Sequence, residues 1–315
     1  MTSRELPPLL VIVGPTAVGK TDLALRLAEH VELEVVSADS RQIYRHMDIG
    51  TAKPLPAERE RVPHHLLDVV EPDRILTLAE YKDLAERAIA AIHSRGKLPA
   101  LVGGTGLYVW AVVENWQRPQ VPPRRELRLR LRQKAETMGA LHLHRRLAEV
   151  DPEAAARIHP NNVRRVIRAL EVHHATGMPI SQQQRSGPPQ YRCLIVGITA
   201  PREWLYARAD ERVEWMLELG LVDETRELLA GGYSPRSPAM SGLGYRQIAA
   251  YLLGQCELDE AIRRMKTATH RFIRQQYTWF RIDDRRISWF EQPVCIPQVV
   301  KLVRAFAGDN CSPSP

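Results

Sequence analysis

One segment constrains this chain more than any other: Gly14-Pro15-Thr16-Ala17-Val18-Gly19-Lys20-Thr21. It fits G-x-x-x-x-G-K-[ST] at every fixed position, follows the apolar run 9–13 and precedes a helical stretch at 22–30. The glycines let backbone N–H groups surround a phosphate, and the start of the helix adds positive potential. Lys20 is expected to neutralise phosphate oxygens and Thr21 to hold Mg²⁺. The segment predicts a di- or triphosphate site without identifying the molecule that carries the phosphates.

Strands and helices alternate in the first part of the chain. Apolar strands are expected at 9–13, 33–37 and 98–102, and a helix at 77–94 begins with the capping box Thr77 to Glu80. This alternation predicts an α/β fold with a doubly wound parallel sheet. Because ligands on such sheets bind beyond the carboxyl ends of the strands, we expect the phosphate loop, Asp39 and the turn 103–105 to share one crevice.

A basic helical insertion interrupts this pattern. The apolar periodicity of 162–176, with Asn162 as cap and Gly177 as stop, predicts a helix, and 124–138 is rich in helix formers. A strand pattern returns at 193–198. We therefore expect a core at 9–117, an insertion at 118–192, the resumed core at 193–307 and a disordered tail at 308–315.

The positive charge is concentrated in the insertion. Residues 118–192 hold 15 Lys and Arg against 6 Asp and Glu, a balance of +9, whereas the whole chain carries +7. The chain also has 37 Arg and 7 Lys, and the Arg guanidinium suits phosphates and stacked bases. A nucleic-acid surface and an ordinary solvated Arg-rich surface both fit this composition.

Composition narrows the class of protein further. No apolar run is long enough for a transmembrane helix, and the polar start lacks a signal-peptide pattern, so a cytoplasmic protein that makes no membrane contact is expected. The four cysteines are far apart and form no C-x-x-C pair, which argues against a zinc or disulfide framework.

Three features of the expected crevice bear on its chemistry. Asp39 could organise Mg²⁺ or accept a proton, or it could cap the segment that follows it. The strand 98–102 ends in Gly-Gly-Thr where many ATPases carry a magnesium-binding Asp, which weakens an ATPase interpretation. Arg246, after a glycine-rich turn, could reach a phosphate or be a plain surface residue at a helix start.

Eight motifs together resemble one family. They lie at 14–21, 37–44, 47–54, 63–68, 102–108, 168–171, 242–247 and 277–281. The set is similar to the tRNA dimethylallyltransferases, the bacterial tRNA isopentenyltransferases, from about Leu9 to Phe290. The resemblance implies transfer of a dimethylallyl group from its pyrophosphate to N6 of adenine 37, beside the tRNA anticodon. It implies Mg²⁺ as cofactor, and we expect a monomer.

The resemblance also implies roles for individual residues. Asp39, Thr21 and Arg246 would be catalytic, and residues 14–21 would bind the pyrophosphate. The implied tRNA contacts are Asp39, Ser40, Arg41, Gln42, Thr105, Arg128, Arg164, Arg165, Val166, Ile167 and Arg168. Two alternatives remain open: a P-loop small-molecule kinase, and a non-enzymatic, nucleotide-gated RNA-binding protein.

Overall fold

The computed structural model describes residues 6–117, 121–183 and 185–308. The chain divides into two compact units, one made of Met1–Val113 with Pro189–Pro315 and the other of Glu114–Pro188. The insertion expected at 118–192 begins and ends four residues later than this second unit. Of the tail expected to be disordered, 308–315, only Gly308 lies within the described residues.

A six-stranded sheet in the order β3-β2-β4-β1-β7-β8 forms the centre of the first unit. The strands are β1 (Pro8–Val13), β2 (Leu33–Ser37), β3 (His64–His65), β4 (Leu98–Gly103), β7 (Arg192–Thr199) and β8 (Ile287–Glu291). Every neighbouring pair is parallel. The strand order reverses around β1, which is the arrangement that opens a ligand crevice at the carboxyl edge. The predicted α/β class with a parallel P-loop sheet is confirmed.

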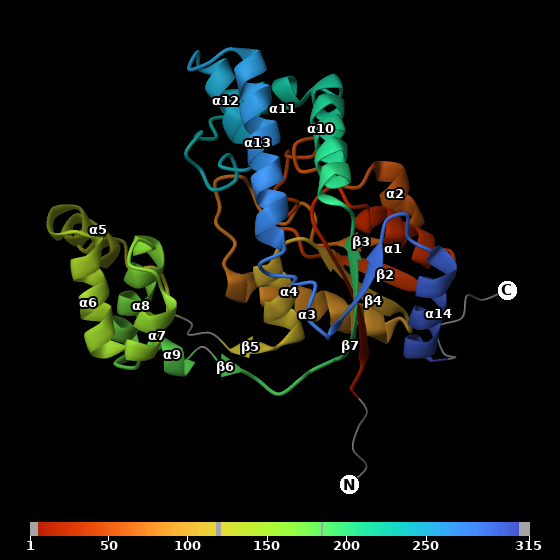
Figure 1. Ribbon diagram of the computed structural model, residues 1–315, viewed down its shortest axis with the longest axis horizontal. Helices are drawn as coiled ribbons and strands as arrows, with labels where there is room; N and C mark the ends of the chain where they lie inside the picture. Colours follow the sequence, from red (N-terminus) through yellow and green to blue (C-terminus); the bar gives the residue numbers. More distant parts are fainter. Residues whose placement is uncertain (1–5, 118–120, 184, 309–315) are drawn as a thin grey trace, which may run out of the picture. The chain divides into compact units, whose positions relative to one another are not determined.

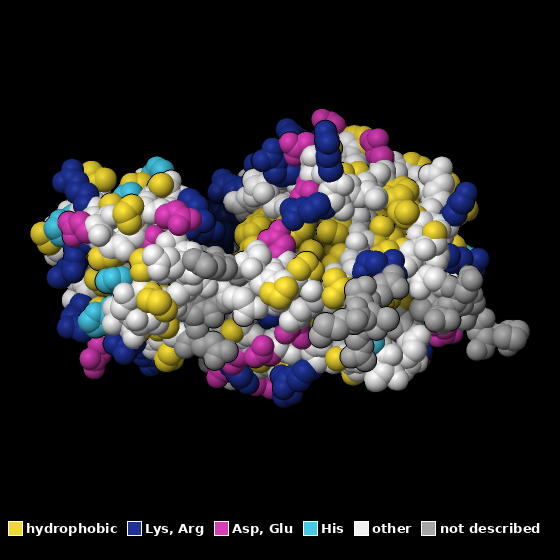
Figure 2. Space-filling view, turned by 90° about the horizontal axis from the view of Figure 1, so that it is seen from below, with side chains coloured by type: hydrophobic (Ala, Val, Ile, Leu, Met, Phe, Trp, Pro, Cys, Tyr) yellow, Lys and Arg dark blue, Asp and Glu magenta, His cyan; other side chains and the backbone are white. Residues whose placement is uncertain are grey.

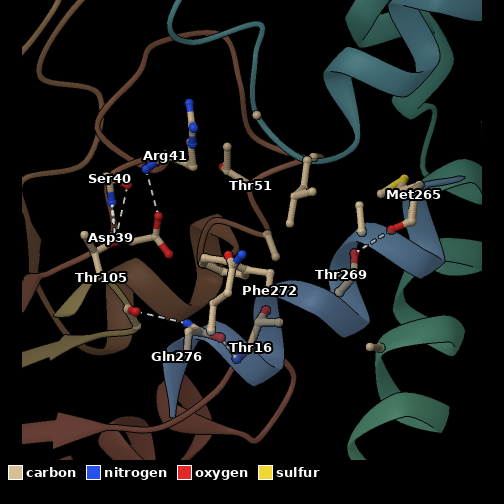
Figure 3. A pocket seen from close by; sticks show the side chains of 18 of the residues that line it. Thr16, Asp39, Ser40, Arg41, Thr51, Thr105, Met265, Thr269, Phe272 and Gln276 are labelled. Atoms are coloured by element: carbon tan, nitrogen blue, oxygen red, sulfur yellow. Dashed lines mark hydrogen bonds between the residues drawn. The ribbon is translucent and has the colours of Figure 1, made fainter. Parts of the chain in front are cut away.

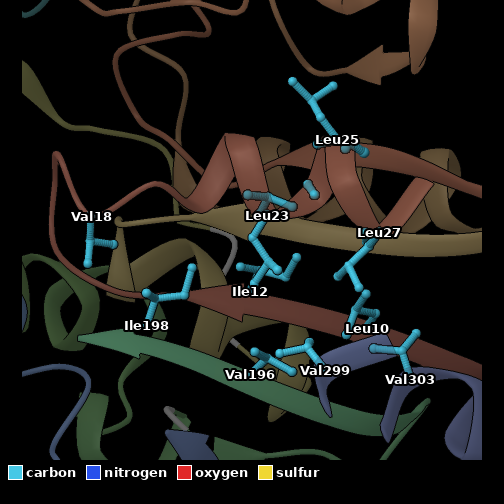
Figure 4. Close-up of a cluster of buried hydrophobic side chains, with 14 of the residues drawn as sticks. Leu10, Ile12, Val18, Leu23, Leu25, Leu27, Val196, Ile198, Val299 and Val303 are labelled. Atoms are coloured by element: carbon cyan, nitrogen blue, oxygen red, sulfur yellow. The ribbon is translucent and has the colours of Figure 1, made fainter. Parts of the chain in front are cut away.

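Helices cover both faces of this sheet. On one face, Leu10 and Ile12 of β1 pack against α1 (Lys20–Ala28) and α14 (Ile296–Ala307), where Leu23, Leu27 and Val299 are buried (Figure 4). On the other face, α3 (Leu78–Ser94) and α4 (Gly106–Val113) pack against β2 and β4. The short helix α2 (Pro56–Arg61) precedes β3. The predicted capping box forms, since Thr77 Oγ1 accepts a hydrogen bond from the Glu80 amide at 3.2 Å.

Four helices stand beyond the carboxyl ends of the strands (Figure 1). They are α10 (Arg202–Glu218), α11 (Leu221–Ala230), α12 (Tyr245–Leu252) and α13 (Leu258–Gln276). Helix α13 packs against both α10 and α12, and α11 packs against α12. Since β7 leads directly into α10, the strand that resumes the sheet also delivers this helical layer to the crevice.

The second unit is a small helical domain. It contains α5 (Arg125–Met138), α6 (Ala140–Val150), α7 (Pro152–Arg157), α8 (Val163–Thr176) and α9 (Ile180–Gln183), with the antiparallel strands β5 (Trp116–Gln117) and β6 (Arg185–Ser186). Its core includes Leu143, Leu147 and Val172. Helix α8 begins and ends as predicted: the Asn162 side chain accepts a hydrogen bond from the Arg165 amide, and Gly177 follows with φ 71°.

Candidate active site

The phosphate loop joins β1 to α1 and carries all eight residues predicted for pyrophosphate binding. Its backbone adopts positive φ at Gly14 (149°), Ala17 (67°) and Gly19 (94°). A Cβ at Gly14 would lie 2.4 Å from the carbonyl oxygen of Ile198, so only glycine fits where the loop passes β7. The side chain of Val18 is buried, so that residue can offer only its backbone to a phosphate.

The Lys20 ammonium is held inside the loop. Its Nζ donates hydrogen bonds to the carbonyl oxygens of Gly14 (3.0 Å) and Pro15 (2.7 Å). Burial lowers the pKa of Lys20 to about 8, the Asp39 carboxylate opposes this shift, and the Arg212 guanidinium adds to it. A bound diphosphate would restore charged partners to this ammonium and raise its pKa again.

Two glutamines from the C-terminal part of the chain support the loop. Gln276 Oε1 accepts a hydrogen bond from the Thr16 amide at 2.8 Å, and Gln276 Nε2 donates to the Gly104 carbonyl at 3.0 Å. Gln292 Nε2 donates to the Val18 carbonyl at 2.7 Å. Sequence reasoning missed both residues. The available signal for Gln276 was its place, with Met265 and Ile273, on the buried side of α13.

Asp39 does not cap a helix, because the residues after it form turns. Its Oδ1 accepts a hydrogen bond from the Arg41 amide at 2.8 Å, and no described residue bonds Oδ2. The neighbouring Ser40 amide donates to Thr105 Oγ1 at 3.0 Å, and the Thr105 hydroxyl lies 3.3 Å from Ser40 Oγ. The turn after β4 therefore fixes the segment that carries Asp39 and leaves one carboxylate oxygen for a ligand.

A cavity of about 560 Å³ connects these elements. Its lining includes Thr16 of the phosphate loop, Asp39 and Thr105, so the three strand ends converge as expected. In Figure 3 Asp39 lies on one side of the cavity and Met265 and Thr269 of α13 lie on the other. The cavity thus has a carboxylate at one side and an apolar wall at the other, and Thr16 of the phosphate loop also lines it.

Two arginines add positive charge to this cavity. Arg246, at the start of α12, lines it as the sequence suggested, and its guanidinium group makes no hydrogen bond or ion pair with the described residues. Arg212 of α10 also lines it, and sequence reasoning missed it. Burial lowers the pKa of Arg212, and nearby Arg208 adds to this effect. Arg212 lies on the side of α10 whose residues Ala209, Val213 and Met216 are buried. A charged residue on an otherwise apolar helix face could have indicated a functional role from the sequence.

The cavity wall at 50–52 is held by a carboxylate from α11. Glu224 Oε2 accepts hydrogen bonds from the amides of Asp48 (2.8 Å) and Ile49 (2.9 Å), and Glu224 Oε1 accepts from the Gly50 amide (3.2 Å) and the Tyr245 hydroxyl (2.6 Å). Burial, followed by the Glu224 charge, raises the pKa of Tyr245 far above its usual range. We call this set, Glu224 with Tyr245 and the amides 48–50, the wall latch.

Two predicted tRNA contacts near Asp39 already have partners within the protein. Gln42 Oε1 accepts a hydrogen bond from Ser37 Oγ, and Gln42 Nε2 donates to the carbonyls of Thr51 (3.3 Å) and Ala52 (3.1 Å). Arg41 Nη1 donates to the Pro238 carbonyl at 2.6 Å. Gln42 therefore shapes the cavity wall in this structure, whereas Arg41 retains further guanidinium donors.

The predicted tRNA-binding residues of the helical unit fall into three groups. Arg164 and Arg165 are exposed on α8. Val166 and Ile167 are 0% and 5% exposed and pack in the core of the unit, so their side chains lie away from its surface. The predicted tRNA contact of these two residues stays a prediction, and it would have to use their backbone. Figure 2 shows Lys and Arg side chains at the surface of this unit, mixed with His and acidic side chains.

Arg128 and Arg168 form the third group, because both bind the buried carboxylate of Glu171. Arg128 Nη2 and Arg168 Nη1 each lie 2.7 Å from Glu171 Oε2, and the Arg124 amide donates to Oε1 at 2.7 Å. Burial raises the pKa of Glu171, but these hydrogen bonds outweigh it and hold the pKa below its usual value. Both arginines therefore stabilise the helical unit, whatever else they contact.

The residues present suit Mg²⁺ only together with a phosphorylated ligand. The described residues contain no cluster of three His, Cys, Asp or Glu that could hold a metal alone. Thr21 offers a hydroxyl in the first turn of α1, and Asp39 offers a free carboxylate oxygen. Mg²⁺ prefers such oxygen ligands and often takes the rest of its shell from phosphates and water. The donor set fits that pattern.

The fold and the site together define a P-loop protein that binds a phosphorylated ligand beside a free carboxylate. A model of the IPP transferase family matches residues 42–283 of the chain. The chain belongs to the IPP transferase family.

The relatives and the solved structures agree with this assignment. The chain is 57% identical over 274 residues to the tRNA dimethylallyltransferase of Roseiflexus sp. strain RS-1, covering 87% of this chain and 90% of the relative. It is 48% identical over 306 residues to that of Dehalococcoides mccartyi, covering 97% and 94%.

Two crystal structures are similar along most of the chain. One is the full-length tRNA isopentenylpyrophosphate transferase of Bacillus halodurans, with TM-score 0.71, 39% identity, and coverage of 96% of this chain and 97% of that one. The other is a eukaryotic dimethylallyltransferase acting on tRNA, with TM-score 0.76, 27% identity, and coverage of 93% and 75%. No helix in the described parts of the chain is long and apolar enough to cross a membrane.

Proposed function

We propose that this enzyme transfers a dimethylallyl group from dimethylallyl pyrophosphate to N6 of adenine 37 in the tRNA anticodon loop, releasing pyrophosphate. One observation carries the proposal: Thr16 of the phosphate loop, Asp39 with its unpaired Oδ2 and an apolar wall line a single cavity. A prenyl donor needs the phosphate loop for its diphosphate and the apolar wall for its hydrocarbon part. An amine nucleophile needs the Asp39 oxygen to accept its proton. Its relatives bear the name tRNA dimethylallyltransferase.

The leaving group is stabilised by the positive end of the cavity. As the allylic C–O bond breaks, its electron pair goes to the pyrophosphate, and charge develops on the phosphate oxygens. The backbone amides of residues 17–21, the Lys20 ammonium and the guanidinium groups of Arg212 and Arg246 can stabilise that charge. Mg²⁺ held by Thr21 and the phosphates would neutralise part of the same charge.

The nucleophile is handled by Asp39. The N6 lone pair forms the new bond to the allylic carbon, and N6 becomes acidic as that bond forms. Asp39 Oδ2 accepts a hydrogen bond from N6 beforehand and takes its proton. The adenine must leave its stack to reach the cavity, which costs a few kcal/mol and requires compensating contacts. Ser40, Arg41 and Thr105 stand beside Asp39 and are proposed to supply them.

The apolar wall suits the hydrocarbon part of the donor. Met216 of α10, and Met265 and Phe272 of α13, line the cavity. Their surface can cover a dimethylallyl group and exclude water from the allylic cation. The arginines exposed on α8, Arg164 and Arg165, are proposed to bind the tRNA backbone. We further propose that the enzyme acts as a cytoplasmic monomer.

The test uses dimethylallyl pyrophosphate labelled in the prenyl group, unmodified tRNA and Mg²⁺. Incorporation of label into tRNA, lost when adenine 37 is replaced by guanine, is the expected result. ATP turnover with transfer of phosphate to a small molecule, and no label in tRNA, would identify a kinase instead. Tight RNA binding without any product would identify an RNA-binding protein.

A further inference from the structure

A second cavity of about 510 Å³ lies along α13, next to the catalytic one. Four of its lining residues are arginines: Arg246, Arg263, Arg264 and Arg271. Glu260 is the acidic residue among its lining. The residues from α13 recur at 260, 263, 264, 267, 268 and 271, a spacing that places them on one face of the helix. The cavity is thus a basic groove built on one helix face.

The charge of this groove is only partly neutralised. Arg263 Nη2 and Arg264 Nε both bind Glu260, at 2.6 Å and 2.7 Å, so two guanidinium groups share one carboxylate. The guanidinium groups of Arg246 and Arg271 make no hydrogen bond or ion pair with any described residue. With four cations and one anion, the groove carries a net charge of +3 and many free N–H donors. Such a site fits a polyanion.

The groove is continuous with the catalytic cavity. Arg246, Ala268 and Arg271 line both of them. The adjacent face of α13, with Met265, Thr269, Phe272 and Gln276, lines only the catalytic cavity. Helix α13 therefore presents a basic face to the groove and a mixed face to the catalytic cavity. An RNA strand that sends one base into the catalytic cavity can place its backbone along the basic face.

We propose that this groove binds backbone phosphates of the RNA strand that flank the target adenine. The proposal rests on the proposed function, because it assumes that an adenine of RNA enters the catalytic cavity. The donor's own diphosphate has a more specific partner in the phosphate loop, where backbone amides and Lys20 converge. Exposed, flexible guanidinium groups suit instead a backbone whose counterions are released on binding.

The test is the salt dependence of binding to an unmodified anticodon stem-loop RNA. Arg263→Gln with Arg264→Gln removes two cations that line the groove but not the catalytic cavity. The matched control is Arg26→Gln with Arg61→Gln. Those side chains are 54% and 57% exposed, against 68% and 56% in the groove, and each also binds a carboxylate. The control arginines line neither cavity.

The groove variant is expected to lower the slope of log K against log salt by about 1 and to weaken RNA binding roughly tenfold at physiological salt. The KM for dimethylallyl pyrophosphate stays unchanged, and the control variant matches the wild type. Charge reversal with Arg263→Glu and Arg264→Glu enlarges the effect. These positions are exposed, so the melting temperature verifies that each variant is folded.

Two results would overturn the proposal. The first is a salt slope that the groove variant shares with the wild type. The second is an increase in the donor KM with RNA affinity intact, which would assign the groove to the donor. The proposed function is judged separately, by label transfer in the wild type, so its failure and the failure of the groove proposal give different readouts.

Discussion

The wall latch offers the sharpest test of how the cavity is held together. Glu224 accepts three amide hydrogen bonds and one hydroxyl hydrogen bond, and Tyr245 completes the set by accepting from the Gly50 amide at 3.1 Å. A Cβ at Gly50 would lie 2.6 Å from the Tyr245 ring, so the backbone of the wall lies directly on this side chain. The latch joins residues 48–50 to α11 and α12.

The expected magnitude follows from these bonds. A hydrogen bond to a charged group contributes about 1.5–3 kcal/mol, and Glu224 is half-buried, so about 1 kcal/mol for each bond is reasonable. Glu224→Ala is then expected to lower the free energy of unfolding by about 4 kcal/mol. Glu224→Gln keeps an acceptor for Asp48 and Ile49 but turns an NH₂ group toward the Gly50 amide. We expect it to cost about 1–2 kcal/mol.

Urea unfolding of Glu224→Gln, Tyr245→Phe and the double variant measures the coupling between the two residues. Because they share one hydrogen bond and one amide donor, a coupling of about 1 kcal/mol is expected. The single variants should also raise the KM for substrate more than they lower kcat, since the wall shapes the cavity without touching the reacting atoms. Additive free energies, or a Glu224→Gln variant as stable and active as the wild type, would refute this reasoning.

Four further predictions concern charge. Asp39→Ala is expected to lower turnover by about 10²-fold or more with little change in RNA affinity, as measured by single-turnover kinetics. A variant as fast as the wild type would remove Asp39 from the mechanism. Lys20, with its pKa lowered to about 8, is charged below that pH and neutral above it, so donor affinity should fall as pH rises through about 8. Calorimetry near pH 8.5 should detect proton uptake on donor binding, and binding without uptake would contradict the assigned pKa. Arg164→Gln with Arg165→Gln should weaken RNA binding without a change in melting temperature. Arg128→Gln, which leaves Glu171 short of a partner, should destabilise the helical unit by about 3 kcal/mol. Equal stability of these two variants would show that the Glu171 network is not structural.

Local patterns in the sequence predicted much of the site. The phosphate loop could be placed because its strand, turn and helix are consecutive, and the parallel sheet then brought Asp39 and Thr105 to the same edge. Asn162 and Gly177 could likewise be predicted as the two ends of α8, because each acts through residues of the adjacent helical turn.

Long-range partners could not be predicted in the same way. Gln276 reaches the Thr16 amide across 260 positions of the chain, and Glu224 reaches the Asp48 amide across 176. No local pattern marks such pairs. Val166 and Ile167 illustrate a different point. Their helical periodicity with Val163 and Leu170 predicted a buried face, and the structure places both side chains in the core of the helical unit.

A crystal structure with pyrophosphate, Mg²⁺ and an anticodon stem-loop tests the central claim most directly. The measured quantity is the distance from Asp39 Oδ2 to N6 of the extruded adenine while the diphosphate occupies residues 14–21. Our account predicts a separation of about 2.6–3.2 Å, or a single bridging water. An adenine bound elsewhere, with its N6 beyond the reach of that oxygen while the loop holds the diphosphate, would contradict the account.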